Sequence, residues 1–291
     1  MTDMHDATLI LPAPAKLNLF LHITGRRPDG YHLLESVFML IDWHDVLHLD
    51  RTVSSQISRE DLNGVALPAD DLITRAARAL QQATGCTQGV RIGIEKHLPA
   101  QAGIGGGSSD AASTLMALNR LWNLKLSRQE LQNIGLKLGA DVPFFLCGHS
   151  AWVSGIGEII TPLTGRNALP EQQFLVVKPE QGLETGKIFS SELLKRDTKP
   201  AIVADFAANH FGFGRNDLQP VAEGLQPEVM KVRSWLESLK LHATMTGSGS
   251  AVFAPITQSI DLSCASSTWQ IKICRNLEKH PLNSWIPENK L

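Results

Sequence analysis

The sequence predicts an α+β protein of two domains. The chain has 291 residues, which is long for one compact core and comfortable for two domains of about 130 to 150 residues. Hydrophobic residues make up 43% and charged residues 19%, as in ordinary globular proteins. Strand-like and helix-like patterns are mixed in both halves without a regular βαβ order. A Pro- and Gly-containing loop over 161–173 is the best boundary and predicts domains 1–165 and 166–291.

Composition and charge exclude several classes of protein. Lys plus Arg number 27 and Asp plus Glu 29, so the net charge is −2 and no strongly basic nucleic-acid footprint is present. Cys86, Cys147, Cys264 and Cys274 form no CxxC pair, which suits reduced thiols in a cytoplasmic protein. No apolar run approaches the roughly 18 residues of a membrane span, and no basic signal-peptide start precedes Lys16. We therefore expect a cytoplasmic enzyme with small-molecule substrates, no nucleic-acid partner and no membrane.

Hydrophobic periodicity predicts the individual elements. Leucines at 17, 19 and 21 alternate with other residues, as in a strand, and a Pro-Asp-Gly turn follows at 28–30. Ser127 and Glu130 form a capping box before a helix, and Asp141 comes directly before a short apolar helix. Further strands are expected over 37–40, 46–49, 90–94, 174–177, 251–254 and 269–274, and further helices over 71–83 and 228–240.

A glycine-rich segment at 99–110 is the most informative stretch. It reads Pro-Ala-Gln-Ala-Gly-Ile-Gly-Gly-Gly-Ser-Ser-Asp, and a helix capped by Ser108 or Ser109 is expected directly after it. Consecutive glycines let backbone N–H groups converge, and the helix N-terminus adds its positive dipole end, so the segment suits phosphate. It is not a Walker A loop, because no Gly-Lys-Ser/Thr closes it, and it lacks the strand–helix–strand context of a dinucleotide fingerprint. The alternative, a flexible surface loop, fits poorly with the apolar strand before it.

Residues 99–112 resemble the central phosphate-binding motif of the GHMP kinases. Residues 14–21, 24–25 and 29–32 (the last Asp-Gly-Tyr-His) are similar to the opening of one branch of this family, and residues 139–145 (Gly-Ala-Asp-Val-Pro-Phe-Phe) agree with the same branch. Residues 246–253 resemble the third family motif, so the resemblance covers roughly residues 12 to 281.

The resemblance implies an N-terminal domain like one found in a ribosomal protein, a ferredoxin-like C-terminal domain and an active site in the cleft between them. It implies ATP-dependent phosphorylation, with Mg²⁺, of the 2-hydroxyl of 4-diphosphocytidyl-2-C-methyl-D-erythritol, a step of non-mevalonate isoprenoid precursor synthesis. We expect a monomer or a weak homodimer.

The resemblance also assigns the nucleotide and catalytic residues. It makes Asp141 the catalytic base and places Lys16 beside it, where the ammonium keeps the carboxylate ionised. From the residues alone, Asp141 could instead be a helix N-cap and Lys16 a solvated lysine, although Lys16 lies inside an apolar strand. The ATP-binding segment comprises Pro99, Ala100, Gln101, Ala102, Gly103, Ile104, Gly105, Gly106, Gly107, Ser108 and Ser109, and the third motif comprises Thr246, Gly247, Ser248 and Gly249.

The substrate residues are likewise implied by the resemblance. Tyr31, the single tyrosine, and Phe189 would stack on the two faces of cytosine, while His32 would read the edge of the base. The remaining substrate residues would be Phe38 against the base and Asn18 and Thr185 at the methylerythritol and phosphate portions. Plain core packing is the alternative for both phenylalanines, and a turn histidine is the alternative for His32.

Two points stay open in the sequence. Asp70-Asp71-Leu72 departs from the Asn-Leu pair of the adenine pocket in relatives, and the protein ligand of Mg²⁺ is unknown, with Ser109 as one candidate. The rival functions are a different small-molecule kinase of the same family and a non-enzymatic RNA-binding protein. An aromatic cytosine clamp argues against the first, and the charge of −2 argues against the second.

Overall fold

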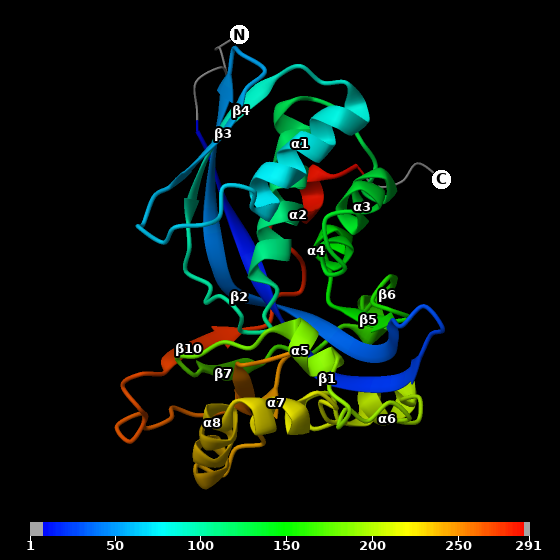
Figure 1. The fold of residues 1–291 in the computed structure, drawn as a ribbon, viewed down its shortest axis with the longest axis vertical. Helices are drawn as coiled ribbons and strands as arrows, with labels where there is room; N and C mark the ends of the chain where they lie inside the picture. The colour runs from blue at the N-terminus through cyan, green and yellow to red at the C-terminus, as the bar shows by residue number, and fades with distance from the viewer. Residues whose placement is uncertain (1–7, 288–291) are drawn as a thin grey trace.

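The computed structural model describes residues 8–287, which form two lobes that share their two longest strands (Figure 1). In the first lobe, helices α1 to α4 cover one face of a six-stranded sheet, and the second lobe joins a four-stranded sheet to helices α5 to α8. The first-lobe elements are β1 (Leu9–Arg26), β2 (His32–Thr52), β3 (Ile57–Asp61), α1 (Leu72–Thr84), β4 (Gly89–Glu95), α2 (Gly106–Leu121), α3 (Arg128–Leu136), α4 (Val142–Cys147), β5 (Ala151–Ser154) and β6 (Ile159–Pro162). After a 3₁₀ turn at Gly165–Asn167 follow β7 (Gln173–Lys178), α5 (Thr185–Phe189), α6 (Val203–Ala208), α7 (Gln219–Leu225), α8 (Pro227–Ser238), β8 (Thr244–Met245), β9 (Val252–Ile256) and β10 (Gln270–Arg275). The α+β, two-domain prediction is confirmed.

The first sheet has the order β3-β4-β2-β5-β6, with β1 paired along β2, and the second has the order β10-β7-β9-β8. The strands expected at 37–40 and 46–49 are parts of one strand, β2, which passes through both lobes beside β1. Shifts in the β1–β2 register fall between residues 14 and 16, 18 and 21, and 23 and 25. Such bulges bend a strand and redirect its side chains, and here they flank the predicted site residues of β1.

Three buried clusters explain why the middle of β1 carries no exposed face. Leu40, Leu49 and Ile92 of the sheet pack with residues of helices α1 to α4. On the other side, Leu17 and Met39 pack against the second sheet, whose far face packs on α7 and α8. Residues 13–23 are therefore all buried, and the alternation at 17, 19 and 21 marks two covered faces.

Locally encoded elements match their predictions. The expected helix over 71–83 is α1, with Asp71 as its cap accepting a hydrogen bond from Thr74 N at 2.8 Å. The capping box of Ser127 and Glu130 is present at the start of α3. These elements were predictable because their signals lie within a few residues of one another.

The C-terminal segment returns to the first lobe after β10. Leu277 N donates to Leu40 O at 2.8 Å, and His280 N donates to Gly148 O at 2.8 Å. Leu282 and Ile286, each 3% exposed, join the core beneath helices α1 to α4. The expected second domain, 166–291, therefore does not lie wholly in the second lobe, since its last described residues complete the first.

Replacing Leu282 by Ala should destabilise the first lobe although the residue lies far along the chain. Loss of a buried leucine side chain costs about 2–5 kcal/mol of unfolding free energy, so the thermal midpoint should fall by several degrees. Leu193→Ala is the matched control, because Leu193 is 87% exposed and its loss should leave the midpoint nearly unchanged. Equal midpoints for both variants in calorimetry would show that the returning segment does not stabilise the core.

Candidate active site

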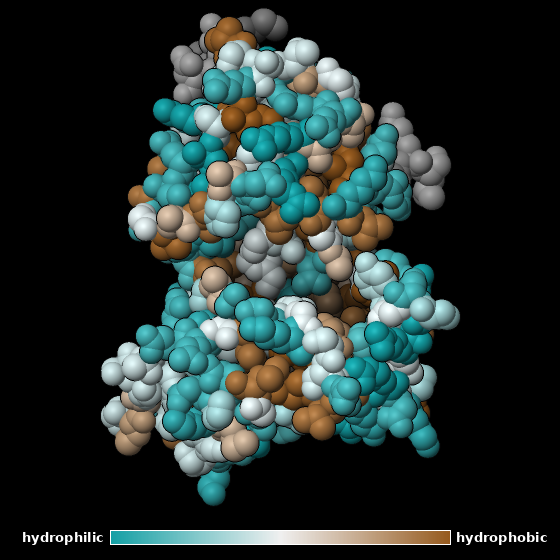
Figure 2. Space-filling model, in the orientation of Figure 1, coloured by the Kyte–Doolittle hydropathy of each residue, from teal (hydrophilic) through white to brown (hydrophobic). Residues whose placement is uncertain are grey.

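A cavity of about 670 Å³ lies between the two lobes. The surface is visibly hollowed there (Figure 2). Many residues expected in the site line it together: Lys16, Asn18, Phe38, Pro99, Ala100, Gln101, Ala102, Gly103, Ile104, Gly105, Gly106, Gly107, Asp141, Thr185, Phe189, Gly247, Ser248 and Gly249. Segments separated by more than 200 residues thus meet in one place, as an active site between lobes requires.

The glycine-rich segment at 99–110, called the phosphate loop from here on, runs into the N-terminus of α2. Gly105, at φ 73°, is the N-cap residue, and no side chain caps the helix. The expected serine caps are therefore wrong: Ser108 and Ser109 lie inside the first turn, and Ser109 Oγ donates to Pro14 O at 2.6 Å. Uncapped N–H groups at a helix N-terminus, together with its positive dipole end, are suited to phosphate oxygens.

The third glycine segment lies directly against this loop. A Cβ on Gly103, whose φ is 73°, would come within 2.2 Å of Thr246 O, and one on Gly247 would come within 2.6 Å of Gly103 O. Two further hydrogen bonds cross between the lobes, from Ser250 N to Gln101 O at 3.1 Å and from Ala251 N to Ala102 O at 3.2 Å. Glycine is needed at 103 and 247 because two backbones touch there.

Lys16 is buried at the centre of the site, with 3% of its surface exposed. Its ammonium hydrogen-bonds Asn18 Oδ1, donates to Gly103 O at 3.1 Å and lies 3.8 Å from Asp141 Oδ2. It also lies 4.8 Å from the centre of the Phe38 ring. Burial lowers the pKa of Lys16, and the Asp141 carboxylate acts in the opposite direction. Lys16 is therefore a fixed, partnered group and not a solvated surface lysine.

Asp141 lies at the start of α4, as predicted, but it does not act as a side-chain cap. Its φ and ψ are helical, and its carboxylate makes no capping hydrogen bond. About 34% of the side chain is exposed, on a residue that lines the cavity. The carboxylate is therefore available to a hydroxyl group beside the phosphate loop.

Asn18 connects this pair to the other segments. Its side chain donates to Ser36 Oγ at 2.9 Å, and its backbone N–H donates to Thr246 Oγ1 at 2.9 Å. Because Asn18 Oδ1 accepts from Lys16, the amide orientation is fixed from both ends. Asn18 thus supports the ammonium position, in addition to any contact with a ligand.

The aromatic residues expected around a base lie partly inside the cavity lining and partly outside it. Phe189 lines the cavity, and its ring centre lies 5.2 Å from that of His32. Phe38 is buried and packs edge-on against Phe144. Tyr31 is 61% exposed in the turn between β1 and β2. Tyr31, His32, Ser108, Ser109 and Thr246 are the predicted site residues that do not line the cavity.

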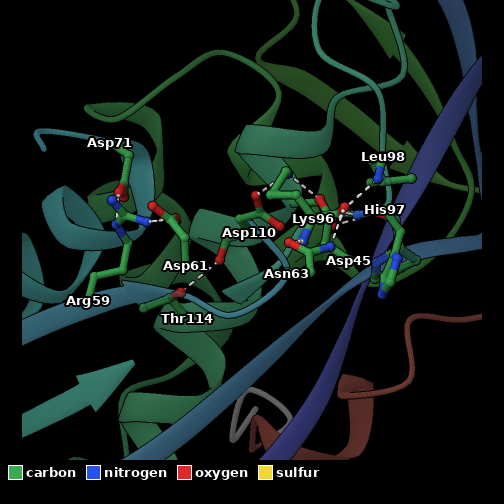
Figure 3. A network of polar contacts seen from close by, with 12 residues as sticks. Asp45, Arg59, Asp61, Asn63, Asp71, Lys96, His97, Leu98, Asp110 and Thr114 are labelled. Atoms are coloured by element: carbon green, nitrogen blue, oxygen red, sulfur yellow. Dashed lines mark hydrogen bonds and ion pairs between the residues drawn. The ribbon is translucent and has the colours of Figure 1, made fainter. Parts of the chain in front are cut away.

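A polar network that the sequence analysis missed lies behind the phosphate loop (Figure 3). Lys96 bridges Asp45 and Asp110, with Lys96 Nζ 2.8 Å from Asp110 Oδ2. Asp45, fully buried, also accepts from His97 N and Leu98 N at 2.6 and 2.8 Å. This network ties the strand that precedes the loop to the helix that follows it.

Further lining residues without a sequence-based prediction surround the loop end of the cavity: Leu67, Asp71, Leu72, Lys96, Leu98 and Asp110. Asp71 forms an ion pair with Arg59 of β3 at 2.5 Å. The apolar side chains offer a slot for a flat ring next to the phosphate loop. Charged residues that interrupt apolar runs, such as Asp45, indicate buried polar contacts. Their partners could not be identified because they are distant in sequence.

The cavity fits a nucleoside triphosphate. It offers uncapped helix N–H groups, loop backbone without side chains and one buried ammonium, with an apolar slot beside them. A protein ligand for a metal is harder to identify. The Ser109 hydroxyl is fully buried and donates to backbone, and within residues 8–287 no three His, Cys, Asp or Glu side chains are placed to hold a metal ion.

Replacing Asp110 by Asn should remove a pH dependence of stability. Burial is the main reason that the pKa of the Asp110 carboxyl is raised to about 8. The charge of Lys96 lowers this pKa, and the charge of Asp45 raises it. The folded protein therefore retains a proton that the unfolded chain releases near pH 4, and this carboxyl costs stability as the pH rises from about 4 to 8. The thermal midpoint of Asp110→Asn minus that of wild type should increase between pH 5 and pH 8. Asp70→Asn, an exposed surface change, is the control, and a flat difference for Asp110→Asn would contradict the raised pKa.

Comparison with known proteins agrees with this geometry. The family description "GHMP kinases N terminal domain" matches residues 71–149, and "GHMP kinases C terminal" matches residues 193–262. A protein of Delftia acidovorans named 4-diphosphocytidyl-2-C-methyl-D-erythritol kinase is 70% identical over all of both chains. One of the same name from Acidovorax sp. is 65% identical over 95% of this chain and 97% of its own.

Solved structures agree as well. A crystal structure of 4-(cytidine 5'-diphospho)-2C-methyl-D-erythritol kinase superposes with a TM-score of 0.78 at 33% identity, covering 92% of this chain and 99% of that one. A homoserine kinase from Cytophaga hutchinsonii shares the fold at a TM-score of 0.71 and 15% identity, over 96% of this chain and 97% of its own. The chain therefore belongs to the GHMP kinase family, and within it to the 4-diphosphocytidyl-2-C-methyl-D-erythritol kinases.

Proposed function

We propose that this chain transfers a phosphoryl group from ATP to the 2-hydroxyl of 4-diphosphocytidyl-2-C-methyl-D-erythritol. The observation that carries the proposal is the placement of Asp141 and Lys16 in one cavity with the phosphate loop. Asp141 Oδ2 lies 3.8 Å from Lys16 Nζ. The 70% identical relative of the same length supports the choice of substrate.

The proposed mechanism depends on position and charge more than on covalent chemistry. ATP supplies the phosphoryl group. The uncapped N–H groups of α2 and the loop backbone from Gly103 hold its phosphates. Asp141 orients the acceptor hydroxyl and accepts its proton, while the Lys16 ammonium, 3.8 Å from Asp141 Oδ2, offsets charge that develops on the transferred group.

The reaction also needs a metal ion, and the protein has an oligomeric state and a location in the cell. We expect Mg²⁺ to accompany ATP, held mostly by phosphate and water, since Ser109 is engaged elsewhere. We expect a cytoplasmic monomer or weak homodimer without a nucleic-acid partner. Within residues 8–287, no helix combines the length and apolar character needed to cross a membrane.

The direct test is an ATP-dependent phosphorylation assay on a panel of acceptors. The cytidylyl methylerythritol substrate should be phosphorylated, while homoserine, mevalonate and simple sugars should not. Turnover of one of those alternatives at a comparable kcat/KM would refute the substrate assignment while preserving the kinase assignment. Salt-dependent RNA binding without any ATP turnover would refute both.

Asp141→Asn should separate catalysis from folding. The change removes the charge and the proton-accepting ability but keeps the shape, and no capping hydrogen bond is lost because none is present. The value of kcat should fall by about 10²–10⁴, with both substrates still bound and an unchanged melting midpoint. Single-turnover transfer, with Asp70→Asn as an exposed control, measures this. Transfer within about threefold of wild type would remove Asp141 from the chemical step.

Tyr31→Ala should affect the cytidylyl substrate alone. Because Tyr31 is 61% exposed, its loss should leave the melting midpoint unchanged. If the ring closes on the base when substrate binds, affinity for that substrate should drop by about 1–3 kcal/mol while ATP affinity stays the same. Calorimetric titration with each ligand distinguishes the cases, and equal losses for both would argue against stacking.

A further inference from the structure

Arg196 lies in the segment after α5, and hydrogen bonds fix its guanidinium group. Nη2 donates to Ser191 O at 2.7 Å, and Nη1 donates to Leu194 O at 3.0 Å. Its remaining nitrogen, Nε, donates to Nε2 of His32, the first residue of β2, at 3.0 Å. The side chain therefore joins the loop after α5 to the start of β2, a strand that both lobes share, through one histidine ring.

This contact determines where the hydrogen on His32 lies. A guanidinium group remains protonated and can only donate, so Nε2 of His32 must supply a lone pair. In a neutral imidazole the hydrogen is then on Nδ1. Burial, followed by the charges of Arg196 and Arg26, lowers the pKa of His32, which keeps the ring neutral at physiological pH. Both charged groups that act on this ring are cationic.

The His32 ring is not part of the cavity lining, but it contacts a ring that is. It packs against Phe189, with ring centres 5.2 Å apart and an angle of 42° between the planes. Phe189 and Thr185 line the cavity. Within residues 8–287 no hydrogen bond involves His32 Nδ1, so this donor is unused in the free protein.

We propose that Arg196 is a specificity-determining positioning residue, which fixes His32 as the Nδ1–H tautomer and so presents one donor to an acceptor atom of the substrate base. The identity of that base rests on the proposed function. N3 of cytosine is an acceptor, whereas N3 of uracil carries a hydrogen. A fixed Nδ1–H donor therefore favours a cytidylyl substrate. The other tautomer would present a lone pair on Nδ1, which suits the N3–H group of uracil and not N3 of cytosine.

The first experiment reads the tautomer directly in the full-length protein without ligand. Imidazole ¹⁵N chemical shifts distinguish Nδ1–H from Nε2–H, and His32→Gln identifies the signals of His32. Wild type should show Nδ1–H alone. Arg196→Met should show a mixture with Nε2–H and a higher His32 pKa, because a neighbouring cation is gone. A predominant Nε2–H form in wild type would overturn the proposal.

The second experiment measures selectivity between the cytidylyl substrate and its uridylyl analogue. Arg196→Met should raise KM for the cytidylyl substrate about tenfold and reduce the preference over the analogue, with KM for ATP and kcat nearly unchanged. Arg196→Lys should restore part of the preference, because an ammonium also can only donate. Lys195→Met, an exposed neighbouring change, should behave as wild type.

The outcomes separate the two proposals. If wild type phosphorylates neither nucleotide derivative, the proposed function fails, while the ¹⁵N result still decides the tautomer. If wild type prefers the cytidylyl substrate and Arg196→Met keeps both that preference and the Nδ1–H form, the role of Arg196 is refuted. Should Arg196→Met unfold, Arg196→Lys supplies the comparison, and a lysine variant with Nε2–H and full selectivity would refute it too.

Discussion

Direct contact between two backbone segments, one from each lobe, is the constraint on which the cleft depends. A Cβ on Gly103 or on Gly247 would overlap a backbone carbonyl oxygen of the other segment. Lys16 N also donates to Ile104 O at 2.9 Å, so β1 holds the same loop from a third direction. The phosphate loop therefore has a fixed course before any ligand arrives, which reduces the ordering entropy that phosphate binding must overcome.

Two buried lysines near the loop have different roles because their partners differ. Lys96 lies between the buried side chains of Asp45 and Asp110 and pairs with both, so it links β4 to α2. Lys16 faces one carboxylate that is partly exposed, and its other contacts are neutral oxygens and a ring. An additional negative charge beside Lys16 would be stabilised, whereas one beside Lys96 would meet the Asp45 carboxylate that already pairs with that ammonium. Lys16 is therefore the lysine that can offset added negative charge, whereas Lys96 is already paired within its own network.

Short-range patterns allowed much of this molecule to be predicted. The glycine loop, helix α1 and the position of Asp141 follow from spacing and capping within a few residues. The sequence did not show that 13–23 is buried on both faces, because the second sheet that covers it is formed by strands between residues 173 and 275. The Asp45–Lys96–Asp110 network and the return of Leu282 were missed for the same reason, since long-range pairing leaves no periodic signal.

The two ends of the cleft are built differently. The apolar slot and the phosphate loop come almost entirely from the first lobe, through residues such as Leu72 and Lys96. At the opposite end, His32 lies at the start of β2, where the β1–β2 hairpin packs on the second lobe, and it contacts Phe189 and Arg196 of that lobe. A small displacement between the lobes would leave each of these two ends intact but would change the distance between them. The distance between the two ends of the cleft therefore depends on the relative position of the lobes, which the backbone contact at Gly103 fixes.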